Sequence, residues 1–395
     1  MWRTENSKPA STTTVGKKVW CEVLSALSSP SAAVLASAIQ NEKNWRANYI
    51  LHVVSLVRLQ ASAPPSECLA SCRSGLKALN TSFDFIATGG EVVGSAVDAM
   101  IGQVLPDQFR TRMLMPTSID TGSPSFVLKS PNGHAKPFLS GPDLSAQAAA
   151  WASYGCIENS AAESVKSIAN TPNPASLISN KVFVLLGATS ALGPFKPLCD
   201  LGATIACVAR PGAKLNGLIE EAKKTQVTLL LPVKKGVDVA GADLLEDAPE
   251  LAEWISSILP DRDLVIGCYA YLDGEKHVRA SVAMDLIVDA VTKKRKNTSI
   301  AYLVSPATPC AASAESIAAS RKRFDEAPLW HSIFKVGGAF QKLAPEVDRD
   351  VMIINGCSHM QGPNYALAKL SQQWRAMVAK DDGFLVSANH APASR

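Results

Sequence analysis

The spacing of apolar residues divides the chain into two parts of different character. Before about residue 160, apolar residues recur every three or four positions, which predicts helices over Val19–Ala36 and Trp45–Gln60. A strand, a turn and a helix are predicted from Ser82 onwards, and Pro116–Pro142 has the Gly, Ser and Pro content of a loop. After about residue 180, short apolar runs alternate with amphipathic segments, as a parallel α/β sheet requires.

The second part predicts strands and helices in regular alternation. Helical periodicity is found in Glu246–Leu259, Val278–Lys294 and Asn364–Ala379. The strand candidates are Lys181–Leu186, Thr204–Ala209, Gln226–Val233, Asp263–Cys268, Ser299–Val304, Val351–Ile354 and Phe384–Ala388. The fold class predicted is therefore α/β, a doubly wound parallel sheet of Rossmann type preceded by a mostly helical N-terminal domain.

The stretch Ser160–Asn180 is predicted to be a linker, because Pro172 and Pro174 interrupt any helix there. We place the domain boundary at about residue 175. Residues 1–175 form a mainly helical region with no recognisable catalytic motif, and residues 176–395 form a nucleotide-binding domain. Residues 306–350 are predicted to be an insertion in that second domain.

Composition narrows the class of protein without naming a function. Of the 395 residues, 47% are hydrophobic and 19% are charged, which suits a compact fold. A formal net charge of +4 is too small to indicate nucleic acid as a partner, and no run of apolar residues has the length of a membrane span. The nine cysteines and six histidines lack metal-ligand spacing, so we expect no metal. Unpaired thiols favour a reducing compartment, the cytoplasm or an organelle matrix.

A glycine-containing turn follows the first strand of the second part. The turn has a strand before it, a helix after it and a second strand about twenty residues on, which is the setting of a pyrophosphate-binding turn. Backbone N–H groups and two hydroxyls would meet the phosphates. The cofactor-binding candidates in the turn are Gly187, Thr189, Ser190, Ala191, Leu192 and Gly193.

This turn resembles the glycine-rich turn of the short-chain dehydrogenase/reductase superfamily, usually T-G-x-x-x-G-[IL]-G. Two positions depart from that pattern: Leu186 replaces the leading Thr, and Ala191 replaces the middle Gly. A third departure is the segment Gly267–Asp273, where the family often has Asn-Asn-Ala-Gly. Acyl-chain ketoreductases vary similarly there, so the resemblance leans towards them.

The residues after the second and third strands indicate which dinucleotide is bound. Arg210 ends the second strand, where an NAD-binding site usually places a carboxylate, and a guanidinium there matches the 2′-phosphate of NADP(H). Asp243 and Leu244 resemble the family's Asp-[VL] pair, whose carboxylate meets the adenine amino group. Asp243 is equally suited to be a helix N-cap.

The candidate catalytic pair is Tyr365 and Lys369, which have the Y-x-x-x-K spacing of the same superfamily. Residues four apart share one face of a helix, and an ammonium beside a phenol lowers the pKa of the phenol. Ser305 and Ser358 are alternative partners, each at the end of a strand-like run. Pro392 resembles the family's proline in a cofactor-binding loop.

The resemblance implies an NADPH-dependent carbonyl reductase or dehydrogenase that acts on a small carbonyl or acyl substrate. The alternative is a catalytically inactive NADP(H)-binding subunit or scaffold of a larger assembly. It is favoured by the unusual positions of the serine candidates, by the altered segment Gly267–Asp273 and by the end of the sequence three residues after Pro392. Family habit suggests homo-oligomers through the long helices, but the helix with Tyr365 is equally able to pack on the N-terminal part.

Overall fold

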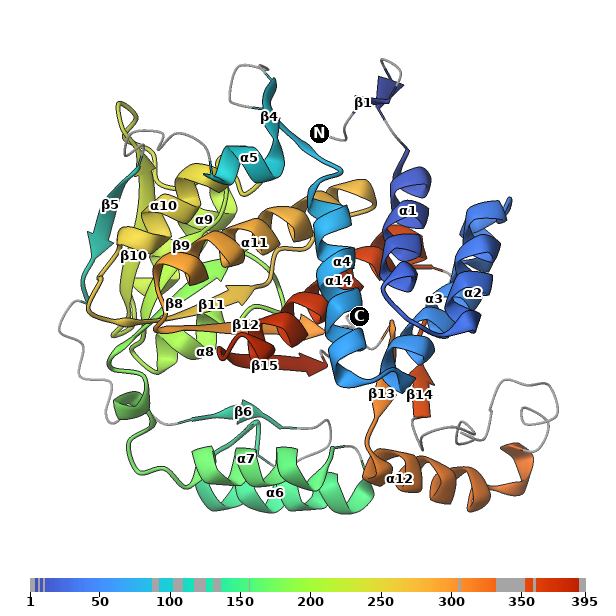
Figure 1. Ribbon diagram of the computed structural model, residues 1–395. Coiled ribbons are helices and arrows are strands. Elements are labelled where there is room, and N and C mark those ends of the chain that lie inside the picture. Colours follow the sequence, from blue (N-terminus) through green and yellow to red (C-terminus); the bar gives the residue numbers. More distant parts are fainter. Residues whose placement is uncertain are drawn as a thin grey trace.

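The computed structural model centres on one seven-stranded sheet (Figure 1). It describes residues 4–5, 8–9, 11–86, 92–101, 109–116, 126–130, 136–155, 157–304, 307–331, 352–357 and 360–390. The sheet consists of β5 (Phe109–Leu114), β8 (Lys181–Leu186), β9 (Thr204–Val208), β10 (Thr228–Lys234), β11 (Asp263–Cys268), β12 (Thr298–Val304) and β15 (Leu385–His390). No helix among these residues is both long and apolar enough to cross a lipid bilayer.

The strand order confirms the predicted fold class. The strands lie in the order β15-β12-β11-β8-β9-β10-β5, and all neighbours are parallel except β10 and β5. Among the six parallel strands, the chain first moves outward from β8 to β10, then returns to β11 on the other side of β8. This is the doubly wound Rossmann order, and its topological switch point lies between β8 and β11.

Helices cover both faces of the sheet. Helices α8 (Phe195–Asp200) and α9 (Ala213–Ala222) pack on one face, over a core that includes Ile205 and Leu231. Helices α10 (Ala248–Ser257), α11 (Glu275–Lys294) and α14 (Gly362–Asp381) pack on the other face. The helix predicted to follow the turn at Gly187–Gly193 is α8, which is only six residues long and contains Pro197.

The first part of the chain adds a further layer of four helices: α1 (Thr12–Ser25), α2 (Pro30–Asn41), α3 (Trp45–Ser62) and α4 (Pro65–Asn80). The prediction of one helix over Val19–Ala36 was wrong, because Pro30 begins a new helix, where its missing N–H costs nothing. Helices α1, α3 and α4 pack on α14, and the buried cluster they share includes Trp20, Leu79 and Trp374. The helix with Tyr365 thus packs on the N-terminal part.

Strand β5 was not predicted, and it joins the two parts of the chain in one sheet. It pairs antiparallel with β10 from Leu229↔Leu114 to Lys234↔Phe109. Its sequence, Phe-Arg-Thr-Arg-Met-Leu, alternates charged residues with others and lacks the apolar run of a buried strand. An edge strand needs only one paired side, so its propensity signal is weak.

The remaining elements lie outside the sheet. One group precedes β8 in sequence: β1 (Thr4–Glu5), β2 (Lys8–Pro9), β3 (Asp84–Ile86), β4 (Val92–Ser95), α5 (Ala96–Ile101), β6 (Leu128–Lys129), β7 (Phe138–Leu139), α6 (Gly141–Tyr154), α7 (Asn159–Ala169) and η1 (Pro174–Leu177). The other group comprises β13 (Pro309–Ala312), α12 (Ala314–Asp325), η2 (Leu329–His331) and β14 (Met352–Asn355). In Figure 1, α6, α7 and α12 lie together along one side of the molecule.

Two expectations about these segments need correction. The expected linker Ser160–Asn180 begins inside helix α7, and its prolines follow the end of that helix at Ala169. The strand candidate near residue 351 is β14, which pairs antiparallel with β13 instead of joining the main sheet. Apolar runs indicate that a strand forms but not which strand it pairs with.

Candidate functional site

The candidate site lies at the switch point, where the loops after β8 and β11 meet. Gly187, the first residue after β8, has a φ of +93°, and a Cβ there would lie 2.5 Å from both the Cα and the N of Ala270. Only glycine tolerates that backbone conformation and that approach without strain. Ala270 follows β11, so the turn and the β11–α11 loop are in direct contact. Ligands of doubly wound sheets bind in the crevice at such a point.

The turn after β8 has two backbone donors without an acceptor among the described residues. The N–H groups of Gly187 and Ala188 both donate to the carbonyl of Val208, at 3.1 Å. Closer to the middle of the turn, the N–H groups of Ala191 and Leu192 have no acceptor within the part of the chain that the structure describes. Free N–H groups in such a turn suit an anionic phosphate. Because α8 is short, the turn itself supplies the donors, and the helix adds little dipole.

The remaining turn residues shape the loop. Ser190 donates its N–H to the carbonyl of Gly187 (2.9 Å), and Gly193 donates to that of Ser190 (3.0 Å), so the backbone makes two successive tight turns. Thr189 lies inside the first of these turns and is partly exposed. All six turn candidates are therefore neighbours at the carboxyl end of β8.

Arg210 and Asp243 lie near each other at the carboxyl ends of β9 and β10. The Nε atom of Arg210 is 4.0 Å from Oδ2 of Asp243, and the Arg210 side chain is 71% exposed. Oδ1 of Asp243 accepts a hydrogen bond from the N–H of Leu245 (2.8 Å). Helix α10 begins five residues after Asp243, so Asp243 does not cap it. Leu244 is buried in the core against α10.

Tyr365 and Lys369 lie on the first turns of α14, near the carboxyl end of β12. The Nζ atom of Lys369 is 6.0 Å from the centre of the Tyr365 ring. It donates to the carbonyl oxygen of Leu303 and to Oε1 of Gln372, both at 3.1 Å. Burial lowers the pKa of Lys369 to about 8. The predicted pair is thus together, at the same edge of the sheet as the turn.

The N-terminal part fixes where this helix begins. Gly362, three residues before Tyr365, has a φ of +81°, and a Cβ there would overlap the guanidinium of Arg46 from α3. The hydroxyl of Tyr49, also on α3, hydrogen-bonds the backbone of Gly362. Helix α3 therefore determines the position of the first turn of α14.

Two aromatic residues that the sequence reasoning did not select stand beside Tyr365. The ring of His277 stacks on that of Tyr365, with centroids 5.5 Å apart and planes at 24°. Tyr271 packs against His277 at 4.8 Å and against Tyr365 at 6.3 Å. His277 lies at the start of α11 and is only 1% exposed. No motif spacing marks these residues, because Tyr365 is distant in sequence from both Tyr271 and His277.

Three predicted site residues, Ser305, Ser358 and Pro392, lie outside the described residues. Which serine is the partner of Tyr365 therefore stays open. Among the residues that the structure describes, no cluster of three or more His, Cys, Asp or Glu side chains could hold a metal ion, and the eight cysteines there are unpaired.

Comparison with known proteins adds little to this geometry. No family model matches the chain, and no curated protein matches it. A solved structure titled "Structure of A-type Ketoreductases from Modular Polyketide Synthase" is similar over 53% of this chain and 36% of that chain, with 12% sequence identity and a TM-score of 0.31. The match thus spans about a third of that protein. The strand order by itself defines the fold class.

Proposed function

We propose that this protein is an NADP(H)-dependent carbonyl reductase, or a dehydrogenase in the reverse direction, of the short-chain dehydrogenase type. The buried ammonium of Lys369 beside Tyr365 carries the proposal. Among the described residues, its hydrogen-bond partners are the neutral oxygens of Leu303 and Gln372, with no carboxylate. A charge kept in such surroundings costs stability, and groups of this kind concentrate at functional sites.

The residues present fit a dinucleotide. The free N–H groups of the turn after Gly187 suit a pyrophosphate, and the exposed guanidinium of Arg210 suits a 2′-phosphate. The carboxylate of Asp243, whose Oδ2 is 4.0 Å from Nε of Arg210, would meet the adenine amino group, as the family resemblance implies. When bound, NADPH would supply the hydride.

The chain's own residues would handle the proton. Tyr365 would give its hydroxyl proton to the substrate oxygen during reduction and take it back during oxidation. Lys369, as an ammonium, would stabilise the phenolate that this leaves behind. Ser305 or Ser358 would hold the carbonyl oxygen. The substrate class is a small carbonyl or acyl compound.

Binding is tested first, by titrating the protein with NADPH and with NADH while following nicotinamide fluorescence. We expect Arg210→Glu to raise the Kd for NADPH about tenfold or more, because a salt-bridging fork becomes a repelling charge. NADH, which lacks the 2′-phosphate, should bind about as before. Lys322→Glu on α12, exposed and with the same change of charge, is the control and should alter neither Kd. Equal loss of both cofactors in Arg210→Glu would contradict the assignment.

Turnover is tested with Tyr365→Phe, screened with NADPH against ketones, aldehydes and acyl thioesters. Loss of the general acid should lower kcat about a hundredfold or more and leave the Kd for NADPH unchanged. If the unaltered protein binds NADPH but reduces none of these compounds, the alternative holds, and the protein is a catalytically inactive NADP(H)-binding subunit or scaffold.

A further inference from the structure

His277 occupies the most unusual position in the candidate site. It is the third residue of α11 and is 1% exposed, yet it carries two polar ring atoms. Its ring stacks on Tyr365, and Lys369 is near enough to act on it electrostatically. Burial, with a smaller contribution from Lys369, lowers the pKa of His277 to about 3. The imidazole is therefore neutral near pH 7 and has one N–H donor and one acceptor nitrogen.

Neither nitrogen is used by the residues that the structure describes. Within the part of the chain that the structure describes, both Nδ1 and Nε2 lack a hydrogen-bond partner. A buried polar atom without a partner costs free energy, and nearly all buried polar groups in folded proteins avoid this cost. Phenylalanine would offer the same stacking to Tyr365 at no such cost. Stacking alone therefore does not explain an imidazole here.

An exposed aromatic residue packs against the ring of His277. Tyr271 packs on the imidazole at 4.8 Å and is itself 51% exposed. It belongs to the loop between β11 and α11, which ends at Gly274 with a φ of +59°. That loop follows the carboxyl end of β11, beside the switch point where a ligand binds. Rotation of Tyr271 would open His277 towards a bound ligand.

We propose that His277 is a specificity-determining residue: its ring nitrogens hydrogen-bond a second polar group of the carbonyl substrate whose reacting oxygen meets Tyr365. The inference rests on the proposed function, since it takes Tyr365 as the group that contacts the reacting carbonyl. The substrate class it selects is a carbonyl compound with another oxygen or an amide within a few bonds of that carbonyl. A site that hydrogen-bonds such a group rejects analogues lacking it.

Two ketones with the same chain length and shape test this selectivity. Ethyl 3-oxobutanoate has a second oxygen function near the ketone, and heptan-2-one has methylenes instead. In His277→Phe, which keeps the stacked ring, we expect kcat/KM for ethyl 3-oxobutanoate to fall about ten- to a hundredfold, mainly through KM. The value for heptan-2-one should change less than about threefold. An equal change for both ketones, or no change for either, overturns the proposal.

A binding measurement decides the matter without turnover and without a variant that must be active. The protein is labelled with 15N-histidine and saturated with NADP+, which has no hydride to give. Addition of ethyl 3-oxobutanoate should shift the ring-nitrogen resonances of His277, identified by their absence from His277→Phe, and heptan-2-one should not. Unshifted resonances with both ketones overturn the proposal. Failure of the unaltered protein to bind NADPH or NADP+ at all is a separate result, and it overturns the proposed function itself.

Discussion

At the scale of single residues, burying the ammonium of Lys369 costs free energy, which other interactions in the folded chain must offset. Burial brings its pKa to about 8 in the folded chain, against 10.5 for an exposed lysine. Below pH 8 the penalty is present in full, because both states carry the proton and only the folded state buries the charge. Between pH 8 and 10.5 the unfolded chain binds more protons than the folded one, so stability from this group rises with pH.

Replacing the charge should therefore stabilise the fold near neutrality. We expect Lys369→Met to raise the free energy of unfolding by about 2 kcal/mol at pH 7, allowing for the two lost hydrogen bonds, and the gain should disappear by about pH 10.5. Urea denaturation followed by circular dichroism at both pH values measures this. Lys380→Met, exposed on the same helix, is the control and should change little. A Lys369→Met protein less stable than the original at pH 7 would show that burial of the charge carries no such penalty.

Sequence pattern selected some residues of the candidate site and not others. Tyr365 and Lys369 have a fixed spacing on one helix, and the turn at Gly187 has a defined strand-and-helix setting, so local pattern is enough to select them as candidates. His277 has no such mark. Its neighbours Tyr271 and Tyr365 come from a loop and a different helix, and only the tertiary fold stacks the three rings.

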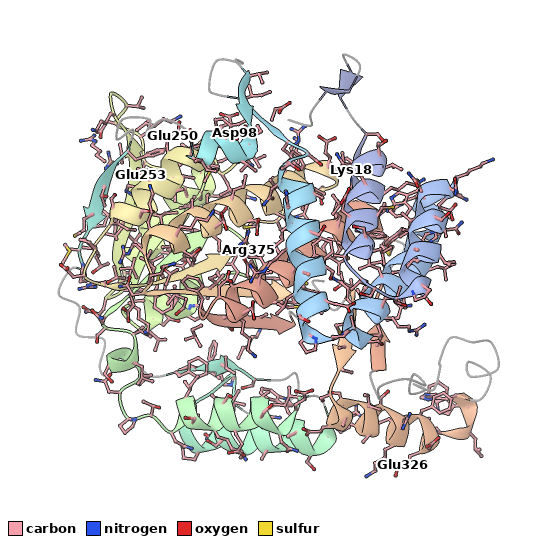
Figure 2. The ribbon with its side chains drawn as sticks, viewed as in Figure 1. Lys18, Asp98, Glu250, Glu253, Glu326 and Arg375 are labelled. Carbon is pink, nitrogen blue, oxygen red and sulfur yellow. The ribbon has the colours of Figure 1, made fainter. Side chains whose placement is uncertain are left out.

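At the scale of elements, apolar periodicity predicted most of the helices and strands around the sheet. It did not predict which elements pair or pack with one another. It missed β5, whose charged residues suit an edge strand, and it merged α1 with α2 across Pro30. Apolar periodicity also did not predict which helices pack on α14. Helices α11, α14 and α4 meet around one buried ion pair, and Figure 2 labels Arg375 at that place in the middle of the molecule.

That ion pair should be important for keeping the three helices together. Arg375 donates from Nε and Nη2 to both carboxylate oxygens of Asp285, at 2.6 and 3.0 Å, and Asn80 of α4 donates to the same carboxylate at 2.7 Å. Among the described residues, Asp285→Asn leaves the largely buried guanidinium with only Asp289 as a charged partner. We expect a loss of about 3 kcal/mol in the free energy of unfolding, measured by urea denaturation at pH 7.

An exposed ion pair on α14 provides the matched control. Asp381 pairs with Arg73 of α4 at 2.9 Å, and both side chains are 46% exposed. Asp381→Asn should cost less than about 1 kcal/mol, because solvent screens the pair. If Asp285→Asn lowered the free energy of unfolding no more than Asp381→Asn does, burial of the Asp285 carboxylate would not strengthen its ion pair.

At the scale of the whole molecule, the division at residue 175 stays a prediction, and the contacts suggest how to test it. Residues 176–395 expressed alone would lose β5 from the edge of β10 and would expose Leu367, Val282 and Trp374, which are now at most 3% exposed. We expect this fragment to lack a cooperative thermal transition by near-ultraviolet circular dichroism, and to regain it when residues 1–175 are co-expressed. A fragment that melts cooperatively by itself would establish an autonomous domain.

The contact between Gln60 and Trp374 also bears on how the chain is made. The indole N–H of Trp374 donates to Oε1 of Gln60 at 3.3 Å, across 314 positions of sequence. At ribosomal rates that separation takes roughly 15 to 60 seconds to synthesise. For most of that interval α1, α3 and α4 have been translated and α14 has not. Nascent chains therefore expose the apolar faces of these three helices, which can bind other unfolded chains. Slow translation or a scarcity of chaperones should therefore harm this protein more than one whose halves mature independently.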